Sequence, residues 1–174
     1  AGARLGPYEV VAPIGSGGMG EVYRARDTRL GRTVAIKVLA QHLCADEERR
    51  ARFEREARTI STISHPHVCA LFDVGRQEDT DYLVMEYIDG VTLGEVLTVL
   101  GRAREHLAVD HAVAIIAAVA GGLHAAHECC DGEGRPLDLI HRDVSPQNVL
   151  ISTAGHVKVI DFGIAKARDR LART

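Results

Sequence analysis

The sequence lacks several features that would assign it to a broad class before any motif is considered. The formal net charge is −3, from 21 Lys plus Arg against 24 Asp plus Glu, so there is no basic excess to attract nucleic acid or an anionic membrane. The longest uninterrupted apolar run, Ala112 to Ala120, has nine residues, and a membrane-spanning helix needs roughly twenty. No secretory signal opens the chain. We therefore expect a globular segment with no nucleic-acid partner and no membrane segment of its own, in a protein whose other parts are free to carry an anchor.

The four cysteines lack the spacing of a disulfide framework or of a zinc site. None forms a C-x-x-C pair, and Cys129 and Cys130 are adjacent, which favours a reducing, cytoplasmic setting. His124 and His127 precede that pair and are an alternative metal site. We favour ordinary helix-end residues, at roughly five to one, because nothing completes zinc-like spacing.

The first half of the chain has the pattern of a strand-rich region with one helix. Extended segments are predicted at 10–14, 21–26, 33–39, 69–74 and 81–87, with polar turns at 30–32 and 75–80. The interval 46–63 changes to helical periodicity, and its apolar face is formed by Phe53, Ala57 and Ile60. His65-Pro66 ends that helix, since proline disfavours helical geometry in the preceding residue.

The second half of the chain is predicted to be richer in helix. We expect a short helix at 92–100 and a long one at 110–128, which is apolar nearly all round and therefore predicted to be buried. Short extended pieces follow at 139–140, 149–152 and 157–160. There is no internal repeat and no low-complexity stretch.

Three motifs carry candidate chemistry. The spacing Gly15-x-Gly17-x-x-Gly20 is weak evidence alone, because dinucleotide-binding folds share it and a plain flexible turn is about as good an interpretation. Here the glycines join two predicted strands, which favours a hairpin lying over phosphates. Lys37 alternates with Ala35 and Leu39 on one strand face, where an ammonium needs an anion unless it reaches solvent. Glu56, on the inner side of the predicted helix, is the simplest anionic partner for Lys37.

The strongest signal is His141-Arg142-Asp143, completed by Asn148 and by Asp161-Phe162-Gly163 downstream. A single Asp in such a place is often a turn or cap residue. This ordered set, however, supplies two carboxylates and an amide oxygen near adjoining strand ends. Hard oxygen donors of that kind suit Mg²⁺ shared with substrate phosphates.

With these motifs in order, the chain resembles the eukaryotic-like Ser/Thr protein kinases of bacterial type, from about Tyr8 to its end. The resemblance implies an α+β, bilobal protein-kinase fold. Residues 1–88 would form a complete N-lobe, an antiparallel sheet plus one helix, with the hinge. Residues 89–174 would form a partial helical C-lobe, running through the catalytic loop and cut within the activation segment.

The resemblance also implies a site for ATP and Mg²⁺, with Mn²⁺ as an alternative metal. By it, Asp143 orients the substrate hydroxyl, Lys37 contacts the α/β phosphates and pairs with Glu56, and Asn148 and Asp161 hold metal. The nucleotide would be lined by Ile14, Gly15, Gly17, Gly20, Val22, Ala35, Met85, Glu86, Ile88 and Leu150. A stack that links the lobes would comprise Ile60, Leu71, His141 and Phe162.

Two departures from the family pattern bear on activity. Ser145 stands where kinases acting on Ser/Thr carry a lysine that contacts the transferred phosphoryl group. The chain also ends eleven residues after Gly163, without an Ala-Pro-Glu element or later helices, so we expect these residues alone to be weakly active and marginally folded. The leading hypothesis is ATP- and Mg²⁺-dependent phosphoryl transfer to Ser/Thr hydroxyls of proteins. The rival is a non-catalytic nucleotide-binding pseudokinase or scaffold, and a dinucleotide-dependent oxidoreductase is a distant third.

Overall fold

A computed structural model describes residues 2–17, 20–40, 47–137 and 139–162. The chain divides into two compact units. Among the described residues the first unit comprises 2–61 and 70–87, and the second comprises 62–69 and 88–162.

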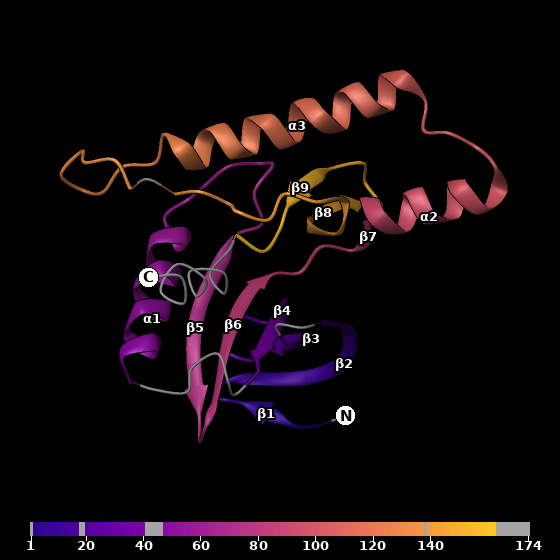
Figure 1. The fold of residues 1–174 in the computed structure, drawn as a ribbon. Helices are drawn as coiled ribbons and strands as arrows, with labels where there is room; N and C mark the ends of the chain where they lie inside the picture. Colours follow the sequence, from indigo (N-terminus) through magenta and orange to yellow (C-terminus); the bar gives the residue numbers. More distant parts are fainter. Residues whose placement is uncertain (1, 18–19, 41–46, 138, 163–174) are drawn as a thin grey trace, which may run out of the picture. The chain divides into compact units, whose positions relative to one another are not determined.

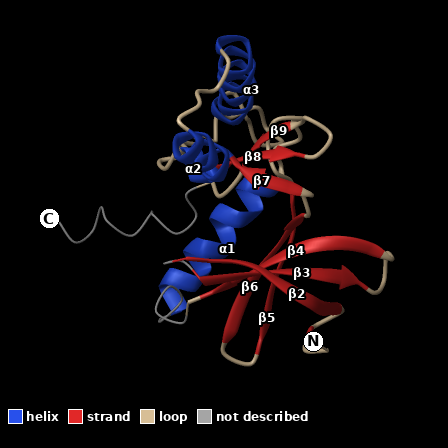
Figure 2. Ribbon diagram, turned by 90° about the vertical axis from the view of Figure 1, so that its right-hand side faces the viewer, coloured by secondary structure: helices blue, strands red, loops and turns tan. Residues whose placement is uncertain are grey.

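The first unit is a six-stranded antiparallel sheet with one helix. Its strands lie in the order β1-β2-β3-β4-β6-β5, and α1 packs beside β5 (Figures 1 and 2). The elements are β1 (Arg4–Leu5), β2 (Tyr8–Gly17), β3 (Gly20–Asp27), β4 (Arg32–Leu39), α1 (Glu47–Ser61), β5 (Leu71–Gln77) and β6 (Thr80–Glu86). The apolar side of α1 is the predicted one, because Phe53, Ala57 and Ile60 are buried.

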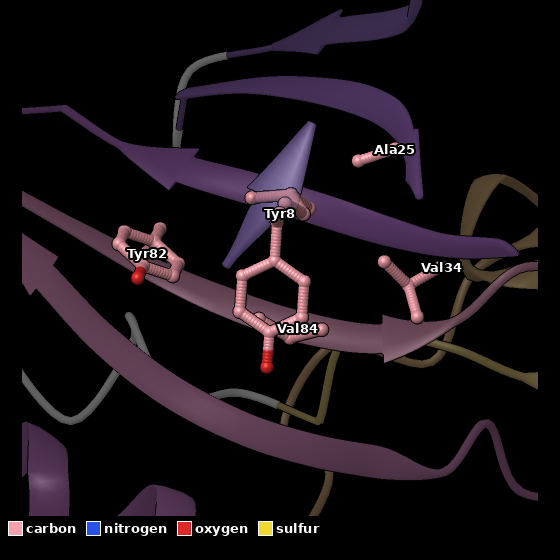
Figure 3. Close-up of a cluster of buried hydrophobic side chains, with 6 residues drawn as sticks. Tyr8, Ala25, Val34, Tyr82 and Val84 are labelled. Atoms are coloured by element: carbon pink, nitrogen blue, oxygen red, sulfur yellow. The ribbon is translucent and has the colours of Figure 1, made fainter. Parts of the chain in front are cut away.

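The core of this sheet is a cluster of apolar side chains from four strands (Figure 3). It contains Tyr8, Ala25, Val34, Ile36, Tyr82 and Val84. The rings of Tyr8 and Tyr82 meet edge to face, with centroids 6.3 Å apart, which is a favoured aromatic geometry. The β-branched residues Val34 and Ile36, at alternate positions of β4, belong to the same cluster.

A polar network surrounds the hydroxyl of Tyr8. The Tyr8 hydroxyl donates a hydrogen bond to Asp73 Oδ2 at 2.8 Å and accepts one from Arg29 at 2.9 Å. Behind it, Asp27 is fully buried, which opposes its ionisation. Backbone N–H bonds from Arg29 and Leu30, with the charge of Arg29, outweigh that burial and hold the pKa of Asp27 below its ordinary value. A buried carboxylate is therefore kept charged by its own turn.

The predicted polar turn is present but shorter than Gly75–Thr80, because β5 continues through Gln77, and Gln77 pairs with Thr80 across a turn at Glu78 and Asp79. Gly75 lies within the strand, opposite Tyr82. The Tyr82 ring covers the position that a Cβ on Gly75 would take. Glycine is required at this position for packing. A glycine in a strand sequence therefore does not by itself indicate a turn.

We expect Gly75→Ala to destabilise the first unit by about 1–3 kcal/mol, because the added methyl overlaps a buried aromatic ring in a packed site. The matched control is Gly101→Ala on a helix of the second unit, where a Cβ meets nothing within 4 Å. That control should be neutral or stabilising by roughly 0.5–1 kcal/mol. Denaturant unfolding of the chain measures both, and equal midpoints for Gly75→Ala and the unchanged chain would contradict the packing argument.

The second unit combines a three-stranded sheet with two helices. Its sheet has the order β7-β8-β9 and is entirely antiparallel (Figure 2). The elements are β7 (Gly90–Thr92), α2 (Leu93–Ala103), α3 (Val109–His127), a 3₁₀ turn η2 (Pro146–Asn148), β8 (Val149–Ser152) and β9 (Val157–Val159). The predicted extended piece at Leu139–Ile140 is wrong, since neither residue pairs as a strand.

The segment after α1 belongs to this second unit and runs beside β9. Val68 forms a parallel bridge with Val159, and Cys69 N donates to Val159 O at 2.9 Å. His67 Nδ1 lies 2.9 Å from Val157 O. On the other side the segment touches α3, where a Cβ on Gly122 would lie 2.8 Å from the His67 carbonyl oxygen. Close approach of the two backbones explains a glycine in the middle of this helix.

The prediction that the long helix is buried holds for only one of its sides. One side of α3 is covered, with Ile115 and Val119 buried, but Val109, Val113 and Ile116 are 80%, 62% and 63% exposed. In the described part of the second unit, β9 and the segment 65–68 pack against one face of α3. Among the described helices, α3 has the length and composition to cross a membrane, a test that core helices of soluble proteins also pass.

Candidate functional site

The glycine motif forms the predicted hairpin between β2 and β3. Gly15 pairs with Val22 and Gly17 pairs with Gly20, while residues 18–19 lie outside the described part of the chain. The strand continues after Gly20, so the helix that a dinucleotide fingerprint requires at this point is replaced by β3.

Gly20 is also required by the sheet itself. Its φ is +129°, and a Cβ there would overlap the carbonyl oxygen of Val38 on β4. Only glycine fits this backbone conformation without strain. The third glycine of the motif therefore has a packing role in addition to any phosphate contact.

Lys37 lies in the middle of β4 and is 7% exposed. It pairs with Val22 on β3 and with Leu83 on β6, so its neighbours across the sheet are apolar. Ala35 is buried two residues before it, and Glu56 is half-buried on α1 of the same unit. A buried ammonium is stable when an anion meets it. The pairing of Lys37 with Glu56, or with a nucleotide phosphate, stays a prediction.

The predicted hinge begins at the end of β6. Met85 pairs with Ala35, and Glu86 N donates to Ala70 O at 2.9 Å. That N–H is therefore engaged, so an adenine base would have to use another backbone group at Glu86. Ile88 belongs to the second unit. Recognition of adenine by Glu86 and Ile88 stays a prediction, as does the contribution of Ile14.

The predicted catalytic loop is organised by Asn148. Its amide nitrogen donates to the main-chain oxygen of Asp143 at 2.8 Å and to Asp143 Oδ2 at 3.2 Å. Its main-chain N–H donates to Ser145 O at 2.9 Å, which closes η2. The structure thus brings Asp143 and Asn148 together, five residues apart, with the Asp143 carboxylate held in one orientation.

His141 connects this loop to the segment that carries Asp161. The imidazole is 1% exposed, with Nε2 2.9 Å from Ile160 O, and its Nδ1 accepts from Asp143 N at 3.3 Å. Since Nδ1 accepts an N–H, the ring proton is on Nε2 and the ring donates to Ile160. The Phe162 ring lies against it, with centroids 4.7 Å apart. His141 is a positioning residue for both carboxylate-bearing segments.

Asp161 has a left-handed backbone, with φ at +58°. Such a conformation is uncommon outside glycine, though short polar residues tolerate it. The preceding residue is fixed, because Ile160 N donates to Asn148 O at 2.9 Å. This bond places Asp161 one residue beyond a main-chain contact with Asn148. Gly163, the last residue of that motif, lies outside the described residues.

The donor set in the second unit fits a hard divalent cation. Asn148 directs its amide nitrogen to Asp143, so the side-chain oxygen is the atom that remains to meet a metal. With the Asp161 carboxylate it provides the oxygen ligands that Mg²⁺ prefers. Among the described residues, this site included, no three His, Cys, Asp or Glu side chains are grouped for a metal.

The remaining predicted residues are divided between the two units. Val22 is half-buried on β3 in the first unit, and Leu150 is half-buried on β8 in the second. Ile60 and Leu71 are buried in the first unit, whereas His141 and Phe162 are buried in the second. A nucleotide site or an apolar stack that joins the units stays a prediction.

Sequence reasoning did not find the backbone groups that orient the site. The carbonyls of Ile160 and Asn148 and the N–H of Asp143 fix His141 and Asp161. Every residue carries such groups, so no side-chain pattern marks them. The buried histidine two residues before Asp143 is the only signal in the sequence that points to this arrangement.

Comparison with known proteins identifies the family of this chain. Residues 8–172 match the protein kinase domain family. The chain is 40% identical over 162 residues to serine/threonine-protein kinase PrkC of Bacillus subtilis, which covers 93% of this chain and 23% of that protein. It is 37% identical over 174 residues to tyrosine-protein kinase MasK of Myxococcus xanthus, which covers 97% of this chain and 27% of that protein.

The solved kinase domain of PknI from Mycobacterium tuberculosis superposes with a TM-score of 0.80 at 34% identity, covering 95% of this chain and 62% of the PknI chain. The chain therefore belongs to the protein kinase domain family and has the α+β kinase fold, as the motifs predicted. It spans about a quarter of the length of the curated relatives that it matches.

Proposed function

We propose that this chain is the nucleotide-binding and catalytic-loop portion of a protein Ser/Thr kinase, which transfers the γ-phosphoryl group of Mg-ATP to protein hydroxyls. The observation that carries the proposal is the bonded set of His141, Asp143 and Asn148, tied through Ile160 to Asp161. Such an arrangement suits phosphoryl transfer, in which catalysis is mostly positioning and charge stabilisation. Bound Mg²⁺ would supply charge neutralisation at the phosphates.

Each residue of the set has a definite task in this proposal. Asp143, fixed by the Asn148 amide, accepts a hydrogen bond from the substrate hydroxyl and orients it. Asn148 and Asp161 present oxygen atoms to the metal. In the first unit, the Gly15–Gly20 hairpin covers the phosphates and Lys37 neutralises them, with Glu56 orienting Lys37. Val22, Ala35 and Leu150 line the adenine, and Met85, Glu86 and Ile88 form the hinge.

Nucleotide binding is tested by thermal unfolding of the chain with Mg-ATP. We expect Mg-ATP to raise the melting temperature and NAD to leave it unchanged, because only ligands bound to the native state stabilise it. Asp161→Asn should remove most of the Mg²⁺-dependent part of the shift. Asp79→Asn is the matched control, since Asp79 lies on an exposed turn of β5–β6. An equal shift with NAD, or no shift with Mg-ATP, would contradict the proposal.

A second candidate function is a non-catalytic nucleotide-binding module, and Ser145 is the observation that favours it. An assay of the native gene product that contains this chain distinguishes the enzyme from the binding module. Transfer from ATP to a protein, abolished by Asp161→Asn, decides for the enzyme; tight Mg-ATP binding without transfer decides for the module. The same assay should compare Ser, Thr and Tyr peptides, because the names of the relatives include both Ser/Thr and tyrosine kinases.

A signalling role and a cytoplasmic location complete the proposal. None of the three described cysteines, Cys69, Cys129 and Cys130, forms a disulfide, which suits a reducing compartment. The intact mass of the native gene product, compared with the 18.8 kDa of these residues, measures how much further protein accompanies the kinase segment.

A further inference from the structure

Two adjacent thiols lie at the point where α3 gives way to a loop. Cys130 is exposed and Cys129 is half-buried, and neither forms a disulfide. Cys129 Sγ lies 3.5 Å from Thr62 Oγ1, and Cys130 Sγ contacts Glu128 O at 3.5 Å. A thiol is a weak donor and a weak acceptor, so both contacts are weak. The two sulfur atoms are therefore held by weak interactions at an accessible place in the second unit.

The backbone around the pair is fixed by closely spaced bonds. Leu137 N donates to Cys129 O at 2.9 Å, and Cys130 forms an antiparallel bridge with Pro136. The loop between Cys130 and Pro136 is closed by the Asp131 carboxylate, which accepts hydrogen bonds from Glu133 N and from Arg135 N and Nε. Two thiols on a fixed backbone lose little conformational freedom when one atom binds both.

A direct disulfide between the two residues is disfavoured by geometry. Adjacent Cα atoms are about 3.8 Å apart across a trans peptide, whereas disulfides usually need about 4.4–6.8 Å. A third atom placed between the sulfurs lengthens the bridge and relieves that mismatch. The arrangement therefore suits capture of one soft bridging atom better than oxidation to a disulfide.

The number of available ligands narrows the choice of bridging atom. Zinc in a structural site needs four protein ligands, and the described residues around this pair gather no third His, Cys, Asp or Glu side chain for a metal. The best match is a soft centre that takes two sulfurs and keeps a substituent of its own. Trivalent arsenic has this valence, and thiolates prefer soft partners.

We propose that Cys129 and Cys130 form a two-thiol binding site for trivalent arsenicals. With arsenous acid, two As–S bonds form, two S–H and two As–O bonds break, and two waters leave, with the remaining hydroxyl kept on arsenic. No oxidant or reductant takes part. Neither cysteine belongs to the set proposed for phosphoryl transfer, so this site is independent of the proposed function.

The test uses phenylarsine oxide and the intact mass of the reduced 174-residue chain. We expect one adduct per chain, formed with loss of one water. The dithiol ethanedithiol should remove this adduct, and the monothiol glutathione should not. Cys129→Ser and Cys130→Ser should each weaken capture by roughly 10²–10⁴-fold, the range gained when two attachments are joined on one scaffold. Cys69→Ser and Cys44→Ser are the matched controls and should leave capture unchanged.

Retention of the adduct in Cys130→Ser would overturn the proposal, as would its loss in Cys69→Ser or Cys44→Ser. Cys130 is exposed, so its serine variant leaves the packing of the unit intact. Unchanged thermal unfolding confirms this, and the variant then decides the question even if Cys129→Ser fails to fold.

Discussion

Replacing Asp143 with Asn is expected to lower phosphoryl transfer about 10²–10⁴-fold in the native protein that contains this chain. That range is typical for removal of a group that assists proton transfer. The structure makes the experiment specific, because Asn148 donates to the main-chain oxygen of Asp143 as well as to its carboxylate. An Asn side chain retains an acceptor oxygen, so the loop keeps its bonds and only the charge is lost.

The control for this prediction is Asp79→Asn, the same chemical change at an exposed position whose described ion pair is with Arg76. We expect Asp79→Asn to leave transfer unchanged and Asp143→Asn to leave Mg-ATP affinity within a few fold. Initial rates with a peptide substrate and a binding titration measure the two quantities. Transfer that survives at half its rate or more in Asp143→Asn would remove this residue from the proposed machinery.

The second large effect is a gain of function. Ser145→Lys is expected to raise the transfer rate by up to about 10²–10³-fold, the scale of one preorganised electrostatic donor in another enzyme class. In the family pattern, a lysine at this position contacts the phosphoryl group in transit. Introducing it restores a positive charge where the transition state is negative.

The local structure tolerates this substitution. Ser145 precedes η2 in an extended conformation, and its side chain makes no capping hydrogen bond. The bond that closes the turn, from Asn148 N, uses the main-chain oxygen of Ser145 and is kept in any variant. A longer side chain therefore costs no native contact of the serine hydroxyl with the turn.

Ser145→Met is the matched control, since it adds comparable length without charge. We expect the lysine variant to be faster and the methionine variant to match the unchanged protein, in initial rates at saturating Mg-ATP. Equal rates in all three proteins would show that another group already supplies the charge. An equal gain with methionine would assign the effect to packing.

Most of the strands and helices and the class of protein were predictable from the sequence, whereas the short strands β1 and β7 were not predicted. Strand alternation, the helical period of α1 and the glycine hairpin are local patterns, and each is found where it was predicted. The family also follows from short motifs, since His141-Arg142-Asp143, Asn148 and Asp161 are recognised by type and spacing. The role of each residue in binding and catalysis stays a prediction.

The errors occurred where a local pattern had more than one tertiary outcome. Gly75 was taken as a turn signal, but it lies within β5 beneath the ring of Tyr82. Leu139 and Ile140 have strand composition without a partner strand. The sequence records that a residue is small or apolar, whereas its neighbour in space comes from another part of the chain.

By itself, then, the sequence determined the α+β kinase fold and the family, because these depend on short-range periodicity and on side-chain type. Only the tertiary structure decided which face of α3 is covered, that residues 62–69 join the second unit, and that Asp161 takes a left-handed backbone. It also decided that His141 bonds Ile160 and Asp143 through opposite nitrogens. These features depend on main-chain groups and on contacts between distant residues, which side-chain patterns do not encode.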